Sequence, residues 1–182
     1  TPDALEVFGK KKNLRVMELG PAFFEPLPPL VGKHVSGGLL VQENDPRADE
    51  VRQGRVVTQR APTPEEWDAL DFAWRVCKHV KSNAIVYARA DRTAAVGAGQ
   101  MSRVDSARLA AIKAADRGIP LDGTSVGSDA FFPFPDGVEE IAKAGATAIA
   151  QPGGSIKDAD VIAAADRLGL ALVFTGRRHF RH

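Results

Sequence analysis

The chain has one cysteine, almost no excess charge and no long hydrophobic segment, and each of these absences excludes something. With Cys77 alone it cannot form an internal disulfide, which is typical of cytoplasmic proteins. Its 24 basic and 23 acidic residues give a net charge of +1, so charge offers no argument for a nucleic acid or an anionic membrane as partner. No apolar run approaches the roughly 18 residues that a membrane-spanning helix needs.

What is present is the composition of an ordinary globular protein, with 44% hydrophobic and 26% charged residues. At 182 residues the chain can hold one domain with a sizeable core, or two small ones. It has no starting Met, and its opening is typical of the end of a helix that runs into a strand. We therefore expect a fragment that begins inside a larger fold.

Residues 1–60 are expected to form a lead-in rich in loops and short strands. Alternating apolar and polar residues predict strands at 13–19, 34–42 and 55–59. Four prolines between residues 20 and 31 predict an extended loop, because proline lacks the N–H that a strand ladder needs.

From residue 61 on, short apolar segments alternate with capped helices. The first helix opens with Thr63, Pro64 and Glu66, a capping box with proline at a position where its missing N–H costs nothing. Further helices are predicted at 102–118, 136–145 and 158–169, and buried strands at 84–88, 93–99, 146–150 and 170–174. This alternation predicts an α/β fold, with helices packed on a mostly parallel sheet.

In open α/β sheets, ligands bind beyond the carboxyl ends of the strands, so the loops there carry the candidate site. These loops are expected at 80–83, 97–103, 128–136, 151–155 and 175–182. In the second loop, glycines let backbone N–H groups approach an anion, and Arg103 favours this interpretation over a bare tight turn. Ser155 either caps the next helix or binds a ligand. Asn83 can orient a substrate amide or satisfy its own turn.

The last loop is strongly basic. Arg177, Arg178 and Arg181 are suited to phosphate through their guanidinium groups, and a frayed basic tail is the alternative. His179 and His182 have the spacing H-x-x-H, but no nearby cysteine or acid completes a zinc set. No metal site is therefore predicted.

An aromatic cluster lies in the loop at 128–136. Phe131, Phe132 and Phe134 fall within four positions and are held by Pro133 and Pro135. The prolines restrict the backbone, so the rings are fixed at little further entropic cost. A fixed phenylalanine face can stack on a flat heterocycle, and a plug in the hydrophobic core is the competing interpretation.

Together these segments resemble the transformylase domain of the bifunctional AICAR transformylase/IMP cyclohydrolase family. The matching segments are VKSNAIVYA, GAGQMSRVDSARLAAIKAA, SDAFFPFPDG, QPGGSIKDADVIAAAD and RRHFRH, with KKKNLRVMELG and GGLLVQE upstream. The resemblance runs in order through essentially all 182 residues. It covers only the C-terminal part of the family protein, without the cyclohydrolase domain and the first half of the transformylase domain.

The resemblance implies a cytidine-deaminase-like, three-layer α/β/α unit at 61–182, with 1–60 belonging to the middle of the transformylase domain. It implies transfer of a formyl group from the cosubstrate 10-formyltetrahydrofolate to AICAR in the synthesis of IMP. It also implies a cytoplasmic homodimer with active sites at the subunit interface, and it permits a monovalent cation. Zinc deaminases of related fold use an H-x-E signature and paired cysteines, which this sequence lacks, so no transition metal is expected.

The resemblance also assigns site residues. AICAR contacts are implied at Asn83, Arg103, Phe131, Phe132 and Arg178, and folate contacts at Val104, Asp136, Ser155 and Ile156. The chemistry of the side chains agrees with these roles. Phe131 can stack on the imidazole ring, Arg178 can pair with the 5′-phosphate, and the Asp136 carboxylate can accept from the N–H groups of the pterin. For Asp129 only a bracing role in the loop is expected.

The catalytic Lys-His pair of the family is not expected in this chain. The segment KHVSGG contains Lys33 and His34, but it lacks the proline of the family motif and runs directly into GGLLVQE. We interpret it as the lead-in to a strand, so the catalytic pair is expected upstream. Two other classes stay open: a binding module that keeps the ligand contacts without catalysis, and a fragment whose main task is dimerisation.

The isolated 182-residue chain is therefore expected to show no formyl transfer, because no Lys-His pair is available to polarise the formyl group and accept the amine proton. The measurement is tetrahydrofolate production from AICAR and 10-formyltetrahydrofolate by the pure chain. Product formation that disappears in Lys33→Ala would overturn the interpretation of KHVSGG.

Overall fold

The computed structural model describes residues 1–20, 28–45 and 50–181. The chain forms two compact units, Thr1–Pro46 and Arg47–His182, and each is described by itself. The boundary that the sequence places at residue 60 therefore lies inside the second unit. The reason is that residues 55–58 form hydrogen bonds to residues 172–174, which belong to the second unit's sheet.

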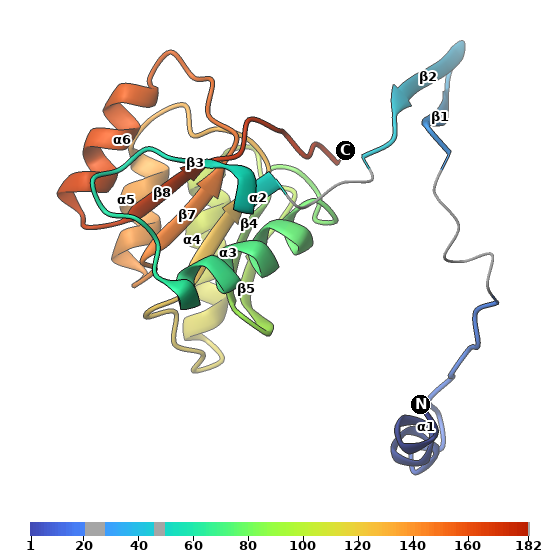
Figure 1. Ribbon diagram of the computed structural model, residues 1–182. Helices are drawn as coiled ribbons and strands as arrows, with labels where there is room; N and C mark the ends of the chain where they lie inside the picture. Colours follow the sequence, from blue (N-terminus) through green and yellow to red (C-terminus); the bar gives the residue numbers. More distant parts are fainter. Residues whose placement is uncertain (21–27, 46–49, 182) are drawn as a thin grey trace. The chain divides into compact units, whose positions relative to one another are not determined.

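The first unit consists of helix α1 (Pro2–Gly9) and a hairpin of strands β1 (Leu30–Val35) and β2 (Gly38–Glu43) (Figure 1). Residues 14–20 form no strand, so the strand predicted at 13–19 is wrong. The strand predicted at 34–42 is in fact two strands, because Gly37 turns the chain with a φ of 82°. Most of the predicted proline-rich loop at 20–31 lies outside the described residues.

The second unit contains one six-stranded sheet in the order β3-β8-β7-β6-β4-β5. Its strands are β3 (Arg55–Val56), β4 (Ile85–Arg89), β5 (Arg92–Gly97), β6 (Ser125–Ser128), β7 (Ala148–Gln151) and β8 (Ala171–Phe174). Its helices are α2 (Glu50–Gln53), α3 (Pro64–Cys77), α4 (Arg103–Ala115), α5 (Asp136–Lys143) and α6 (Asp158–Arg167).

The sheet is mixed rather than mostly parallel. Only β6, β7 and β8 run parallel, whereas β4 is antiparallel to both β5 and β6, and β3 is antiparallel to β8. The connection between β4 and β5 is a tight hairpin, which the alternation of strands and helices did not reveal. Strand β6 was not predicted at all, since its sequence SVGS is small and polar and resembles a turn.

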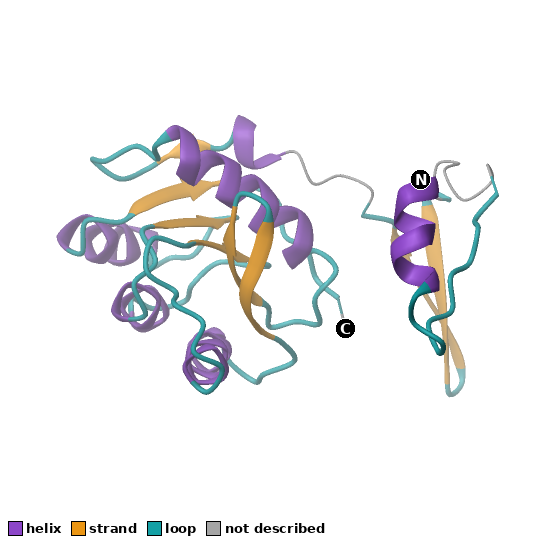
Figure 2. Ribbon diagram, turned by 90° about the horizontal axis from the view of Figure 1, so that it is seen from below, coloured by secondary structure: helices purple, strands orange, loops and turns teal. Residues whose placement is uncertain are grey.

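Helices cover both faces of the sheet (Figures 1 and 2). Because successive side chains of a strand point to opposite faces, each strand contributes to two cores. Ile85 and Leu172 pack in a cluster with residues of α4, α5 and α6. Val86 packs against α3, and Val173 packs with residues of α2 and α3. The three-layer α/β/α arrangement predicted for this part of the chain is confirmed.

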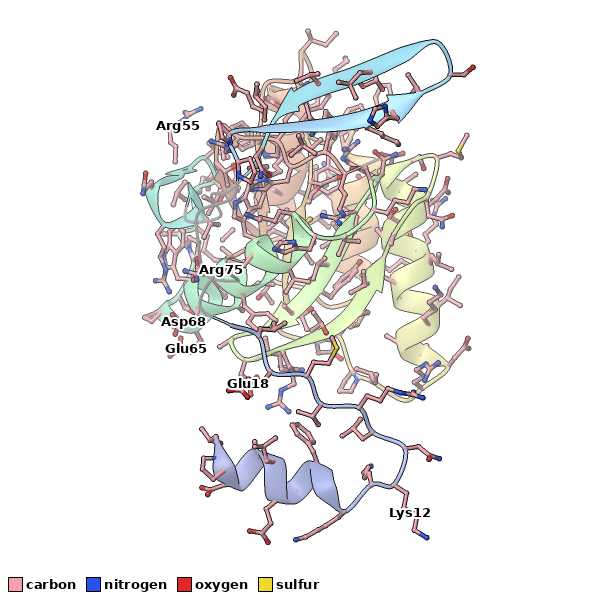
Figure 3. All side chains as sticks on the ribbon, turned by 90° about the vertical axis from the view of Figure 1, so that its right-hand side faces the viewer. Lys12, Glu18, Arg55, Glu65, Asp68 and Arg75 are labelled. Carbon is pink, nitrogen blue, oxygen red and sulfur yellow. The ribbon has the colours of Figure 1, made fainter. Side chains whose placement is uncertain are left out.

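The outer side of α3 is charged. Figure 3 labels Glu65, Asp68 and Arg75 along this helix, and all three are exposed. Arg75 pairs with Asp71 one turn away at 3.1 Å. The helix thus has the buried and solvated sides of a helix that covers a sheet.

The predicted capping box fastens α3 to the sheet. Glu66 accepts the Thr63 N–H at 2.8 Å, while the Thr63 hydroxyl accepts the Glu66 N–H at 3.3 Å. The same carboxylate receives both terminal nitrogens of Arg60, at 2.7 and 2.9 Å, and Arg60 also donates to the carbonyls of Thr147 and Gly169. Burial would raise the pKa of Glu66, but the hydrogen bonds from Arg60 and the Thr63 backbone outweigh it and hold this pKa below its ordinary value.

Glu66→Gln is expected to lower the free energy of unfolding at pH 7 by about 1.5–3 kcal/mol, the usual contribution of hydrogen bonds to a charged group. A lowered folded-state pKa stabilises the fold above the unfolded pKa, and this contribution disappears as pH falls through the folded pKa. The difference between the variant and the unchanged chain should therefore shrink below a pH of about 4.5. Urea unfolding across pH 3–7 is the measurement.

Glu65→Gln is the matched control, since Glu65 is exposed in the same helical turn. It should leave the free energy of unfolding almost unchanged at every pH. An equal loss for Glu66→Gln at pH 3 and pH 7 would show that the charge of Glu66 is not what stabilises the contact.

Candidate functional site

The loops singled out in the sequence meet at one edge of the sheet. Ile85, at the start of β4, pairs with Gly97 at the end of β5 and with Ser128 at the end of β6. Gln151, at the end of β7, pairs with Phe174 at the end of β8. The loops after β5, β6, β7 and β8 and the segment before β4 therefore leave the sheet on the same side. The predicted convergence of these five segments is confirmed.

Asp129 is the buried centre of this edge. It follows β6 directly, and its Oδ1 accepts a hydrogen bond from Nη2 of Arg103 at 3.1 Å. The Asp129 N–H donates to the carbonyl of Ala84, and the Asp129 carbonyl accepts the N–H of His179 at 2.9 Å. One residue thus connects four of the five segments. Within the described part of the chain, Oδ2 of Asp129 and Nε of Arg103 are buried without a hydrogen-bond partner.

The start of α4 is held tightly against the sheet, which places Arg103. Gly97 lies against the backbone of Ser106, where no Cβ could be accommodated. The Ser106 hydroxyl donates to the carbonyl of Asn83 at 2.7 Å, and the Asn83 side-chain amide donates to the carbonyl of Gln100 at 3.0 Å. Asn83 therefore bonds through its side chain to the loop after β5 rather than to its own turn, at the same edge as Arg103.

Cys77 lies beneath this centre and has no nucleophilic role. Its Sγ is 3.5 Å from the Gly127 carbonyl oxygen and 3.7 Å from that of Ala84. Burial raises the pKa of the Cys77 thiol well above its ordinary value; the charge of Asp129 adds to this increase and that of Arg103 opposes it. The residue remains a neutral thiol that packs in the core.

The aromatic cluster is divided between the core and the surface. Phe132 is completely buried in the cluster formed with α4, α5 and α6, and its N–H donates to Oε1 of Gln151 at 2.7 Å. Phe131 is half-buried, and Phe134 is 57% exposed. Phe132 thus acts as the core plug, so the AICAR contact assigned to it has no side-chain face to use. Phe131 alone of the two assigned rings reaches the surface.

The C-terminal segment is anchored through residue 181. The Ser82 N–H donates to the Arg181 carbonyl at 2.9 Å, and the Ser82 hydroxyl accepts the Arg181 N–H at 3.0 Å. The His179 ring packs on Trp74 with centroids 4.6 Å apart. A frayed basic tail is therefore the wrong interpretation for residues 177–181, while His182 lies outside the described residues.

Arg178 extends from this anchored segment over the aromatic loop. Its Cζ lies 4.8 Å from the centroid of the Phe131 ring and 5.9 Å from that of Phe180. These distances are within the range of a cation–π interaction. The guanidinium group and the ring that the sequence assigned to one ligand are direct neighbours.

An open cavity of ≈ 310 Å³ lies between the loops after β6 and β7. It is lined by Phe131, Pro133, Phe134, Gly154, Ser155, Ile156 and Lys157. Ile156 is 99% exposed. Apart from Lys157, the side chains of this cavity are uncharged, so it is suited to an apolar or aromatic group.

The loop after β7 differs from the capping arrangement considered for Ser155. The N-cap of α6 is Lys157, and the Ser155 hydroxyl accepts the Lys157 N–H at 3.1 Å. The Asp158 carboxylate accepts the N–H groups of Gly154 and Ser155, at 2.7 and 3.2 Å. The Ser155 hydroxyl therefore stabilises the turn, and the Asp158 carboxylate accepts the backbone N–H groups of Gly154 and Ser155.

Two further assigned residues lie at helix starts on the same edge. Val104 is half-buried in the first turn of α4, next to Arg103. Asp136 is exposed at the start of α5, and its Oδ1 accepts the Gly137 N–H at 2.8 Å. Among residues 1–20, 28–45 and 50–181, no three His, Cys, Asp or Glu side chains come together as a metal site. None of the helices in these ranges is long and apolar enough to cross a membrane.

Sequence reasoning missed two polar residues that organise the edge. Asp129 was given only a bracing role, and Gln151 was given none, although both are fully buried. A signal was present in each case, because each polar residue stands at or just after the end of a short buried strand. The partner of each side chain comes from another loop, and a single sequence does not show that partner.

Comparison with known proteins gives the family. A profile of the AICARFT/IMPCHase bienzyme matches residues 1–113. The chain belongs to this family. Over 183 residues it is 61% identical to the bifunctional purine biosynthesis protein PurH of Sorangium cellulosum, covering 100% of this chain and 34% of that protein.

Two other PurH proteins match as fully. The protein of Chloroflexus aurantiacus is 58% identical over 187 residues, and that of Myxococcus xanthus is 53% identical over 186 residues. Each alignment covers 100% of this chain and 35% of the relative. The chain therefore spans about a third of the length of the curated relatives it matches.

Asp129→Asn tests whether the buried pair organises the edge. The substitution keeps the side-chain size but leaves the Arg103 guanidinium, 13% exposed, without a counter-charge. Breaking a buried pair in this way is expected to cost about 3–5 kcal/mol of unfolding free energy. Urea unfolding at pH 7 gives the measurement, with Asp116→Asn at an exposed position as the control. A loss close to that of the control would remove Asp129 from this role.

Proposed function

We propose that this chain is the C-terminal part of an AICAR transformylase, in which it helps to transfer a formyl group from 10-formyltetrahydrofolate to AICAR in purine biosynthesis. The parent protein would also carry IMP cyclohydrolase activity in sequence outside this chain. The observation that supports the proposal most directly is the convergence of Asn83, Arg103, Phe131 and Arg178 on one sheet edge. These residues come from separate loops, and the resemblance of the sequence to the family implies that all of them contact one nucleotide.

The nucleotide half combines an aromatic face with guanidinium groups. Phe131 stacks on the imidazole ring, and Arg178 pairs with the 5′-phosphate through its planar fork. Arg103 has a free Nε beside the buried carboxylate of Asp129 within the described chain, which supports a second polar contact. Phe132 acts through the backbone, because its bond to Gln151 fixes the position of Phe131.

The folate half lies on the other loops. The cavity of ≈ 310 Å³ beside Ser155 and Ile156 suits one ring system of the folate, at the lower end of the size of ligand pockets. Val104 adds an apolar contact from α4. Asp136, exposed and acceptor-only when ionised, receives the N–H donors of the pterin.

The catalytic Lys-His pair is supplied from outside the chain. Lys33 and His34 are neighbours in β1, where they pair with Leu40 and Leu39 of β2. Adjacent residues of a strand point to opposite faces, so these two side chains cannot act together on one formyl group. Lys33 and His34 thus lie inside a strand rather than in the lead-in to one, and this position supports a catalytic pair from outside the chain.

The assembly around the site is part of the same proposal. The complete protein is a cytoplasmic homodimer that shares active sites across its interface, and the free buried thiol of Cys77 suits that compartment. Oδ2 of Asp129, buried and unpartnered among the described residues beside the C-terminal loop, fits a monovalent cation as ligand. Such an ion would supply positive charge there, and residues of this chain would contribute to the binding of both substrates.

The complete protein should produce tetrahydrofolate from AICAR and 10-formyltetrahydrofolate, and two variants should separate its substrates. Asp136→Asn replaces half of the carboxylate with a donor, so it should weaken folate binding by about 1.5–3 kcal/mol and leave AICAR binding nearly unchanged.

Phe131→Leu keeps bulk and removes the flat face, so it should weaken AICAR binding by about 0.5–1.5 kcal/mol. Separate titrations with each substrate are the measurement.

The melting temperature of each variant is recorded as the control for loosening of the loop. Equal loss of both ligands in both variants, at an unchanged melting temperature, would show that the loop acts as one structural unit. Absence of formyl transfer in the complete protein would contradict the proposed function itself.

A further inference from the structure

Arg178 covers the ring on which the heterocycle is proposed to stack. Its Cζ lies 4.8 Å from the Phe131 centroid, which is within the separation of two stacked aromatic rings. A flat ligand on this face and the guanidinium group would therefore occupy the same space. Among residues 50–181 no carboxylate forms an ion pair with Arg178. Its guanidinium group lies instead near the rings of Phe131 and Phe180.

Only the side chain of Arg178 is free to move. The backbone on its C-terminal side is held by the His179 N–H bond to Asp129 and by the two bonds between Ser82 and Arg181. On its N-terminal side, the Thr175 hydroxyl accepts the N–H of Arg177. Arg178 itself is exposed, and a long arginine side chain can rotate without a change in this backbone.

We propose that Arg178 is a gate that makes the site specific for a 5′-phosphorylated heterocycle: it covers Phe131 in the free protein and leaves the ring when it pairs with the phosphate. This inference rests on the proposed function, since the nucleotide is taken to be AICAR. It goes further by giving Arg178 two positions and by making phosphate binding a condition for stacking.

The energetics favour such a gate. A nucleotide exchanges the cation–π contact of Arg178 for a charge-assisted, bidentate bond to phosphate, which is the stronger interaction. A nucleoside offers no phosphate, so its ring must displace the guanidinium without replacing that contact. A ligand shifts an equilibrium only by its difference in affinity for the two states, and here the phosphate carries this difference. The gate therefore adds to the discrimination that the lost phosphate contact already gives.

Ligand binding to the complete protein tests the gate through Arg178→Ala, with AICAR and its unphosphorylated riboside as probes. The variant should bind AICAR about 10- to 150-fold more weakly, because a charge-assisted contact is lost. It should bind the riboside about two- to fivefold more tightly, because the Phe131 face is now uncovered. An arginine that only contacts phosphate predicts an unchanged riboside affinity, and that result, or a weaker affinity, would overturn the gate.

Inorganic phosphate provides a second arm of the same titration. Phosphate should draw Arg178 off the ring and so tighten riboside binding to the unchanged protein, and by linkage the riboside should tighten phosphate binding equally. The effect should be absent in Arg178→Ala. Arg55→Ala is the matched control, because Arg55 lies 5.9 Å over Phe174 in the same kind of contact and has no part in the proposed gate. It should leave both affinities unchanged.

The position of Arg178 can also be followed without any nucleoside, in the 182-residue chain. A guanidinium over an aromatic face shows an upfield ring-current shift of its Nε–H signal in NMR spectra. The shift should be present in the unchanged chain, smaller in Phe131→Leu, where only the more distant Phe180 ring remains, and reversed on addition of inorganic phosphate. A shift that phosphate does not change would overturn the gate even if formyl transfer is present. A reversible shift in a protein that does not bind AICAR would retain the gate and contradict the proposed substrate.

Discussion

The buried contact between Asp129 and Arg103 is the constraint on which the candidate site depends. A carboxylate with no exposed surface needs a partner, and Arg103 provides it from the start of α4. The backbone of the same residue holds Ala84 and His179, so the segment before β4 and the C-terminal loop are fixed relative to the loop after β6. The groups proposed to bind the nucleotide, Asn83, Arg103, Phe131 and Arg178, each lie within two residues of Asp129 or of one of its contacts.

The residues of the edge divide into anchors and ligand-facing groups, often within one loop. Phe132 is buried and bonded to Gln151, while its neighbour Phe131 reaches the surface. His179 packs on Trp74, while its neighbour Arg178 lies over the Phe131 ring. Because each ligand-facing side chain is adjacent to a fixed one, its backbone needs no reordering when a ligand binds. This arrangement reduces the entropy lost on binding, and it leaves side-chain rotation as the main conformational freedom.

The sequence predicted helices α3 to α6 and the convergence of the loops, because caps, glycines and apolar periodicity are local signals, but it did not predict the short helix α2. It failed where the deciding contact is not local. Strand β6 forms because it pairs with β4 on one side and with β7 on the other, although the sequence SVGS alone resembles a turn. The antiparallel direction of β4 against β6 likewise follows from the hairpin with β5. Asp129 and Gln151 were undervalued because their partners lie 26 and 19 residues away.

The two units also differ in how much of their stability comes from their own residues. In the second unit, both faces of the sheet are covered by helices, and strands β4, β6, β7 and β8 are largely buried. In the first unit, α1 has no buried residue, and every residue of β1 and β2 is exposed, including Leu39 and Leu40. An isolated two-stranded hairpin is marginally stable in water. Burial within the first unit therefore contributes little to the stability of this hairpin.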